Sequence, residues 1–448
     1  SATHRGDPVS LLDLDPVLDK LKQEILDPNY IKSLARELLL DNQHRIRLIL
    51  KPDAQLANNK DQIEKDRLSA INDSLSDNQK QAIVDSAAAL KQRQETEENL
   101  DILPKVDLDD IPQDIHFSEP NHRQKQPLPL TSYAAGTNGL VYQQLIMPMP
   151  ELSPAQMDIL PLYSTCVTEM GVGNRNYQET QLWHSSVVGS YSASTSVRTH
   201  RNDLSKLHGN ISLACKGLAS NQSAMSELMQ ESFTLARFDE LERLKELIAQ
   251  ILTHKESSVV SNGHVLAMMA ASSEMSPYAH LQQRWSGMTG LSSLKKLNQA
   301  ISSDTELHNL AEQLKVIHHL VLNQPRQFLL VSEKQRLEEF SHSMASSFVG
   351  DNKQQTNNLI DYQPQLSSVN HCWTASTQVS FCAKAFPTVA GSHPDSAPLT
   401  LLGGILRNGF LHRAIREQGG AYGAGASQDS QSGAFRFFSY RDPRIEGT

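Results

Sequence analysis

The first hundred residues show mainly helical patterns. Apolar residues recur at three- and four-residue spacing over residues 17–26 and 28–40, which predicts two amphipathic helices separated at Asp27-Pro28. Residues 44–52, HRIRLILKP, favour a short strand. Residues 60–99 are charged and rich in helix formers, with a break near SLSDNQ, and predict a helical hairpin with narrow apolar stripes. We expect this part to be a connector, because it offers little apolar surface for a core.

The pattern then mixes strands and helices. A strand is predicted over residues 137–149, after an Asn138-Gly139 turn, and a helix follows with Ser153 as its N-cap. Further strands are predicted at residues 187–198, 209–218 and 326–333, with helices around Trp183 and over residues 222–322 and 334–348. This order favours an α+β sandwich, in which a mostly antiparallel sheet lies under helices.

The last part begins after a polar stretch at residues 350–370, which is the best candidate for a domain boundary. Residues 372–386 alternate like a strand, residues 397–417 form a helical pattern, and a glycine-rich turn leads to a strand at residues 433–442. We therefore predict an α+β chain made of a helical hairpin linker (1–118), an α+β domain (119–350) and a second, partial α+β domain (351–448). We expect this last domain to be cut short, because no helix follows to cover its sheet.

Composition narrows the function classes. Hydrophobic residues make up 39% and charged residues 20% of the chain, as in soluble globular proteins, and no apolar run approaches the ~20 residues that span a bilayer. The net charge of -9 is concentrated in residues 51–120, where eight Lys and Arg face sixteen Asp and Glu. No basic face for nucleic acid is indicated. The four cysteines form no CxxC pair and suit buried, reduced thiols in a reducing compartment.

The stretch REQGGAYGAG, residues 416–425, is the most informative local motif. Phosphate-binding loops run from a strand through glycines to a helix N-terminus, whereas here a helix ends and a strand begins. Gly419 or Gly420 therefore suits the left-handed residue that ends a helix. On spacing alone, Arg416 is explained by the helix dipole and Tyr422 by packing. A second glycine loop, GVGNRN at residues 171–176, also follows a helix and is predicted to be a connection.

The segments LRNGFLHRAIREQGGAYGAGAS and GAFRFFSYRDPRIEGT resemble pitrilysin/insulinase-type zinc metallopeptidases, and within that clan the presequence protease subfamily. Residues 139–171 and 176–197 resemble the same family, and the acidic hairpin resembles its linker. The resemblance identifies the chain as the linker plus the C-terminal, non-zinc half. It implies a clamshell of two halves, each with two α+β domains, that closes over a chamber and degrades short unstructured peptides.

The resemblance also implies roles for single residues. In this family the non-zinc half contributes an arginine and a tyrosine, with five residues between them, to the cleft. Arg416 and Tyr422 match, and the implied role of both is to donate hydrogen bonds to the substrate carbonyl and to the oxyanion that develops during hydrolysis. Gly419 and Gly420 would let the peptide backbone approach.

A second pair of residues lies close to this motif. Arg441 and Asp442, in SYRDP, could be placed near the chamber, but an ion pair at the end of a strand is the favoured interpretation.

The zinc motif of this family, HxxEH, has no counterpart in the chain, since none of the 17 histidines lies in an HxxEH or HExxH arrangement. We expect zinc in the parent enzyme, held by the N-terminal catalytic half of the same polypeptide, and no metal bound by this chain alone. The alternative is a non-catalytic scaffold or peptide-binding homologue. The expected partners are unfolded peptides, with neither nucleic acid nor membrane, and the expected location is the bacterial cytoplasm or, alternatively, the mitochondrial matrix.

Overall fold

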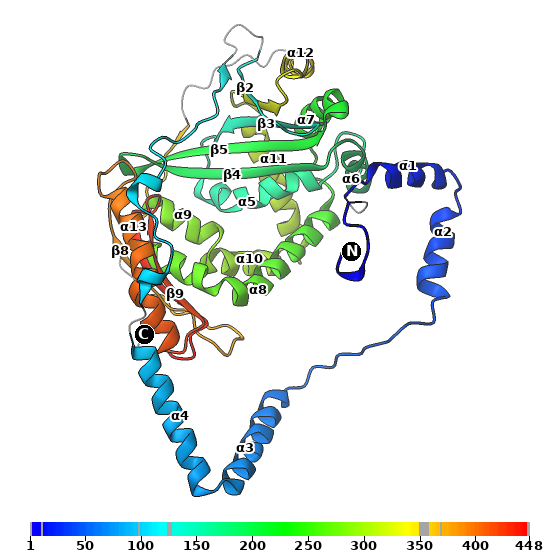
Figure 1. Cartoon of the computed structure of the whole chain (residues 1–448). Coiled ribbons are helices and arrows are strands. Elements are labelled where there is room, and N and C mark those ends of the chain that lie inside the picture. The colour runs from blue at the N-terminus through cyan, green and yellow to red at the C-terminus, as the bar shows by residue number, and fades with distance from the viewer. Residues whose placement is uncertain are drawn as a thin grey trace. The chain divides into compact units, whose positions relative to one another are not determined.

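The computed structural model describes residues 2–9, 12–96, 99–122, 128–348, 358–367 and 370–445 (Figure 1). The chain forms two compact units, Ser1–Leu100 and Asp101–Thr448. Each unit is described by itself below.

The first unit consists of helices without a core. No described residue in it is buried, and its apolar side chains are exposed, including Ile46 at 95%. Figure 1 shows two long helices diverging from the break at Leu75, where Ser76 and Gln79 form a capping box. Its helices are η1 (Ala2–His4), α1 (Asp15–Glu24), α2 (Tyr30–Ala35), the π-helical η2 (Arg36–Leu40), α3 (Leu56–Ser74) and α4 (Asp77–Glu95).

The strand predicted over residues 44–52 is wrong. These residues are extended but make no ladder, because the described part of the first unit holds no second strand to pair with them. The predicted helices, by contrast, form within a few residues of their expected bounds.

The second unit is built on a large sheet of the order β1-β2-β6-β3-β5-β4, with β7 paired to β5. All of its pairs are antiparallel except β2 with β6. Strands β1 and β2 were not predicted from the sequence, since both are short. The strands are β1 (Asn121–His122), β2 (Leu130–Ala134), β3 (Leu140–Pro148), β4 (Ser190–His200), β5 (Asp203–Leu218), β6 (Gln327–Ser332) and β7 (Leu359–Ile360).

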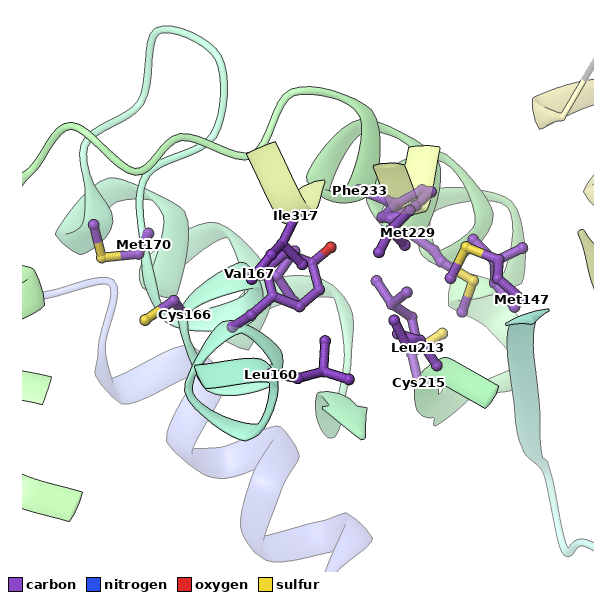
Figure 2. Packing of buried hydrophobic residues seen from close by; sticks show 14 of the residues in the cluster. Met147, Leu160, Cys166, Val167, Met170, Leu213, Cys215, Met229, Phe233 and Ile317 are labelled. Carbon is purple, nitrogen blue, oxygen red and sulfur yellow. The ribbon is translucent and has the colours of Figure 1, made fainter. Parts of the chain in front are cut away.

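One face of this sheet carries the core. Along β3, Val141, Gln143, Leu145 and Met147 are fully buried while the residues between them are not, as a strand of period two requires. Figure 2 shows Met147 and Leu213 of the sheet close to helical residues such as Phe233. The helices are η3 (Leu100–Ile102), η4 (Leu108–Asp110), α5 (Pro154–Glu169), α6 (Tyr177–Val187), η5 (Ala219–Asn221), α7 (Gln222–Thr234), α8 (Leu241–Ser272), α9 (Pro277–Trp285), α10 (Met288–Ala300), α11 (Asp304–Leu322) and α12 (Leu337–Ser347).

A smaller, three-stranded antiparallel sheet has the order β8-β10-β9. Its strands are β8 (Ala383–Pro387), β9 (Gly423–Asp429) and β10 (Ala434–Tyr440). Helix α13 (Ser396–Leu406) and the π-helix η6 (Arg407–Glu417) pack on it through a core of Leu411, Ala426 and Phe435. The strand predicted over residues 372–386 forms only at its end, because β10 is paired on both sides by β8 and β9. The predicted α+β class with mostly antiparallel sheets is confirmed.

Helix α8 joins the small sheet to the rest of the second unit. Its backbone leaves the helical conformation at Asn262, and the next residue, Gly263, lies against the ring of Phe381. A Cβ on Gly263 would come within 2.3 Å of that ring. The His264 ring then packs against Phe438 and Tyr440 of β10, with centroid distances of 5.6 and 4.7 Å. The position of the small sheet is thus set by a bend in α8.

Two sequence predictions need comment. All four cysteines are free, but only Cys166 and Cys215 are buried, and burial raises the pKa of each to about 12. Cys372 is exposed, which contradicts the expectation of four buried thiols. The boundary predicted at residue 350 falls among residues 349–357, outside the described residues, so the division of the second unit stays a prediction.

The core predicts a loss of stability in mild acid. Burial lowers the pKa of His184 and His318 from the usual 6.5 to about 4. At pH 7 both are neutral in the folded and unfolded states, whereas between pH 6.5 and 4 only the unfolded state takes up the protons. Going from pH 7 to pH 5 should therefore cost about 2 kcal/mol of unfolding free energy for each histidine, measured by urea denaturation. His318→Gln should remove its share, while the exposed His342→Gln should not; equal losses in both variants would contradict the assignment.

Candidate functional site

The turn that carries the candidate site begins where the helix ends. Gly420 N donates to Arg416 O at 3.0 Å, and Ala421 N donates to Ile415 O at 3.1 Å, so two nested bonds close the last turn of η6. Gly420 has φ +82°, the left-handed conformation that glycine adopts without strain. Strand β9 starts three residues later. The predicted sequence of helix end, glycine and strand is confirmed.

The turn brings Arg416 and Tyr422 together. The centre of the Arg416 guanidinium lies 5.6 Å from the centroid of the Tyr422 ring. Tyr422 also packs edge-on against Tyr440 of β10, with centroids 5.7 Å apart and ring planes at 72°. Both residues remain exposed, Tyr422 at 63%. The two side chains therefore share one surface, and the tyrosine is supported by the sheet rather than buried in it.

The charge of Arg416 is not consumed by an ion pair. Its Nη1 lies 3.4 Å from His412 Nε2, and no described carboxylate is within ion-pair distance of it. Glu417, the nearest acid in sequence, is paired instead with His412 Nδ1 at 3.4 Å. Because Arg416 donates to Nε2, the proton of a neutral His412 resides on Nδ1, where it faces Glu417. The remaining N–H groups of Arg416 are free to donate to another molecule.

The two glycines of the motif have steric reasons of their own. A Cβ on Gly419 would come within 2.4 Å of Ile415 O and 2.7 Å of Arg444 Nη2, so the turn leaves no room for a side chain there. At Gly420 the space is open and the backbone conformation is the constraint. Both glycines are explained by the turn, and their predicted contact with a peptide backbone stays a prediction.

The ion pair expected between Arg441 and Asp442 does not form. Asp442 is fully buried, and its Oδ1 accepts from Arg444 N at 3.0 Å. The guanidinium of Arg441 stacks on the Tyr440 ring at 5.4 Å, since φ +51° at Arg441 turns the chain away from the strand. Asp442 thus shapes the end of β10 from inside.

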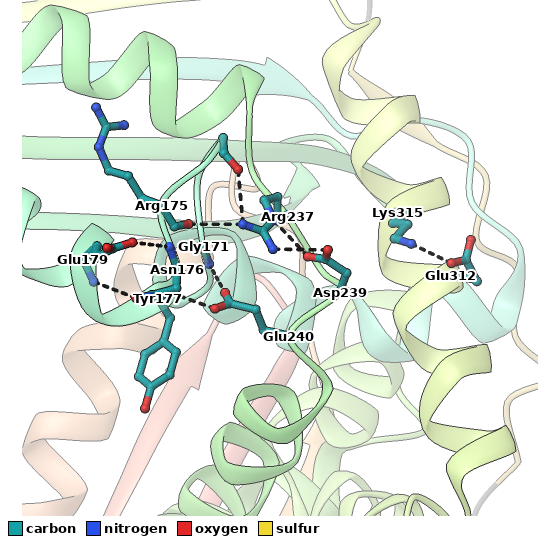
Figure 3. A network of polar contacts seen from close by, with 11 residues as sticks. Gly171, Arg175, Asn176, Tyr177, Glu179, Arg237, Asp239, Glu240, Glu312 and Lys315 are labelled. Carbon is teal, nitrogen blue, oxygen red and sulfur yellow. Dashed lines mark hydrogen bonds and ion pairs between the residues drawn. The ribbon is translucent and has the colours of Figure 1, made fainter.

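The second glycine loop is closed by its own acid (Figure 3). The loop runs from Gly171 directly into α6, so a helix N-terminus is present after all, contrary to the polarity argument from the sequence. Glu240 occupies that end: its carboxylate accepts from Gly171 N at 2.6 Å and from Tyr177 N at 2.9 Å. The loop is a connection, as predicted, because a carboxylate of this chain takes the place of an anion.

Within the part of the chain that the structure describes, no three His, Cys, Asp or Glu side chains lie close enough together to hold a metal ion. Among the same residues, no helix is both long and apolar enough to cross a membrane.

Comparison with known families decides the relationship. The family of domains associated with subfamily C of the M16 peptidases matches residues 50–297, which is more than half of the chain. The chain belongs to this family. The "Peptidase M16 inactive domain" matches residues 334–446, which include α13, η6 and the Arg416–Tyr422 turn. The resemblance to the presequence protease type of M16 peptidase, in the half that carries the inactive domain, is thereby confirmed.

Relatives of this M16 peptidase chain carry the name of one enzyme. The chain is 29% identical over 456 residues to "Presequence protease, mitochondrial" of Yarrowia lipolytica, covering 99% of this chain and 45% of the relative. It is 25% identical over 477 residues to the protein of that name from Xenopus laevis, covering 99% and 46%. The chain therefore spans less than half the length of these relatives. A crystal structure of a Helicobacter pylori protease has a TM-score of 0.51 at 13% identity, covering 74% of this chain and 76% of that one, which supports the fold.

The geometry of the turn predicts contrasting effects of two glycine substitutions. Gly420→Ala places a Cβ on a residue with φ +82° and should lower the free energy of unfolding by about 1 kcal/mol. Gly423→Ala is the matched control, because its new Cβ meets nothing closer than 3.8 Å. Urea denaturation of both variants measures the difference. Equal stability would show that the left-handed residue does not define the turn.

Proposed function

We propose that the protein acts as the substrate-binding half of a zinc metalloendopeptidase that degrades short unstructured peptides in a closed chamber. The observation that supports this role is the pairing of Arg416 and Tyr422 on one exposed surface, with a guanidinium that no described carboxylate neutralises. The names of the relatives support peptides as substrates.

In this proposal Arg416 and Tyr422 act as donors. The guanidinium and the phenol O–H bind the carbonyl oxygen of the peptide bond to be cleaved, and they bind it more strongly as negative charge develops on that oxygen. Tyr440 and His412 are positioning residues: the first supports the tyrosine ring, and the second accepts from the guanidinium. Both donors are then oriented before the substrate arrives, so little reorganisation is needed during the reaction.

Zinc in this proposal belongs to the partner half. The described residues of this chain offer no cluster of ligands for it, and the sequence offers no HxxEH motif. The expected partners are therefore unfolded peptides and an N-terminal catalytic half. The names of the relatives favour the mitochondrial matrix over the bacterial cytoplasm as the location.

Removing either donor should slow catalysis in the complete protein. In a protein that joins this chain to a catalytic half, Arg416→Ala and Tyr422→Phe should each lower kcat roughly 10²-fold, the usual scale for one lost oxyanion donor. Cleavage of a quenched fluorescent peptide, with and without a chelator, measures the effect. Arg407→Ala is the matched control, because this exposed arginine lies on the same helix one residue after α13.

Two results would contradict the proposal. Unchanged kcat in both donor variants would return Arg416 and Tyr422 to purely structural roles. Cleavage that resists the chelator, or no cleavage at all, would favour the non-catalytic scaffold instead.

The chain by itself should show no chelator-sensitive hydrolysis of the same peptide. The reason is that the implied metal ligands lie outside it. Chelator-sensitive cleavage by the purified 448-residue chain would place the metal site here and overturn the division of labour between the halves.

A further inference from the structure

A polar cavity of about 770 Å³ lies beside the turn that joins β4 and β5, at the far end of the small sheet from Tyr422. Ser392, from the loop before α13, fixes one wall: its N and Oγ donate to Arg201 O at 3.0 and 2.9 Å. Thr199 fixes the β9–β10 hairpin next to it, since its N and Oγ1 donate to Gln431 at 2.9 and 2.6 Å. The cavity is therefore formed where the two sheets of the second unit meet.

The lining of this cavity is positively charged. Arg198 and Arg201 both line it, neither makes an ion pair with a described residue, and no Asp or Glu is among the lining residues. The two nearby acids are engaged elsewhere, Asp203 with Lys206 at 3.3 Å and Asp429 with Arg436 at 3.3 Å. Two guanidinium groups without a carboxylate partner are suited to bind an oxyanion from another molecule.

Two histidines complete the polar wall. The rings of His200 and His208 stack with centroids 5.5 Å apart and planes at 29°. Asn202 N donates to His200 Nδ1 at 3.2 Å, so a neutral His200 keeps its proton on Nε2 and offers a further donor. His208 Nδ1 lies 2.6 Å from Asn358 Oδ1, which fixes the orientation of the second ring. The wall is therefore rich in fixed donors.

We propose that this cavity binds the C-terminal carboxylate of a peptide, with Arg198 and Arg201 as the principal donors. The proposal rests on the proposed peptide-binding function. A volume near 770 Å³ is in the range of sites for ligands of several residues' size, whereas a single small ion needs far less. Strand β9 runs from beside Tyr422 to the hairpin held by Thr199, and its seven residues span roughly 20 Å. A peptide anchored by its carboxylate would thus reach the Arg416–Tyr422 surface about six extended residues from its C-terminus.

Binding of matched peptides to the 448-residue chain tests the proposal. The probe is an unstructured peptide of about ten residues with an uncharged fluorophore at its N-terminus, prepared as the free acid and as the C-terminal amide. By fluorescence anisotropy, the free acid should bind about tenfold more tightly or better, the scale of charge-assisted hydrogen bonds. The double variant Arg198→Gln/Arg201→Gln should bind both forms equally. Asn202→Asp, which adds a carboxylate to the wall, should also weaken binding of the acid.

The control variant Arg47→Gln/Lys51→Gln removes two exposed positive charges from the first unit and should keep the preference for the acid. Circular dichroism melts establish that each variant is folded. Equal binding of acid and amide by the wild-type chain, binding of neither, or an intact preference in both cavity variants would overturn the proposal. So would inorganic phosphate that binds the cavity while acid and amide bind alike, since the site would then serve a free anion. Peptidase activity is measured separately, so an acid preference without cleavage would contradict only the proposed function.

Discussion

The contact between the Phe381 ring and the backbone of Gly263 is the constraint on which the second unit depends. Because Gly263 has no side chain, the ring lies directly against α8 at its bend, and the small sheet docks there. His264 then meets Tyr440, and Tyr440 supports Tyr422. The orientation of the candidate site is therefore set through a chain of ring contacts that begins at a glycine far away in the sequence.

The two units are stabilised in different ways. The second unit buries apolar side chains from its large sheet and from the helices on it, so the hydrophobic effect supplies its stability. The first unit buries none of its described residues and relies on local interactions. These are the Ser76 capping box and exposed ion pairs one helical turn apart, such as Arg67 with Glu64. Such interactions contribute only tenths of a kcal/mol to about one kcal/mol each, so its helices are stable only to the extent that local preferences hold them.

The sequence predicted those features that depend on short-range periodicity and capping. Ser153 and the glycine turn at Gly420 lie where their local chemistry indicated, and most strands and helices follow their expected patterns. The failures have a common cause: a strand exists only if a partner pairs with it, and nothing in residues 44–52 reveals whether a partner is near. In the same way β2 was missed, although it pairs in parallel with β6 from the other end of the second unit.

The candidate site divides along the same line. The turn between Arg416 and Tyr422 was predictable, because both residues lie within one short segment, while their proposed roles came from family resemblance. The pairing of Glu417 with His412, which leaves Arg416 uncompensated, depends on side-chain geometry that spacing does not determine. The cavity of Arg198 and Arg201 was out of reach, since Ser392 and Asn358 come to it from distant parts of the chain.

The small core of the three-stranded sheet has a consequence for the order of folding. Leu411, Ala426 and Phe435 are few, and a sheet of this size with so small an apolar centre is marginal on its own in water. Its stability comes from contacts made across long loops, such as Gly263 with Phe381 and Thr199 with Gln431, and closing long loops early costs chain entropy. Helix α8 and the β4–β5 turn must therefore be formed before the small sheet gains a surface to fold on. The part of the molecule that carries Arg416 and Tyr422 is, by this reasoning, the last to become ordered and the first to open.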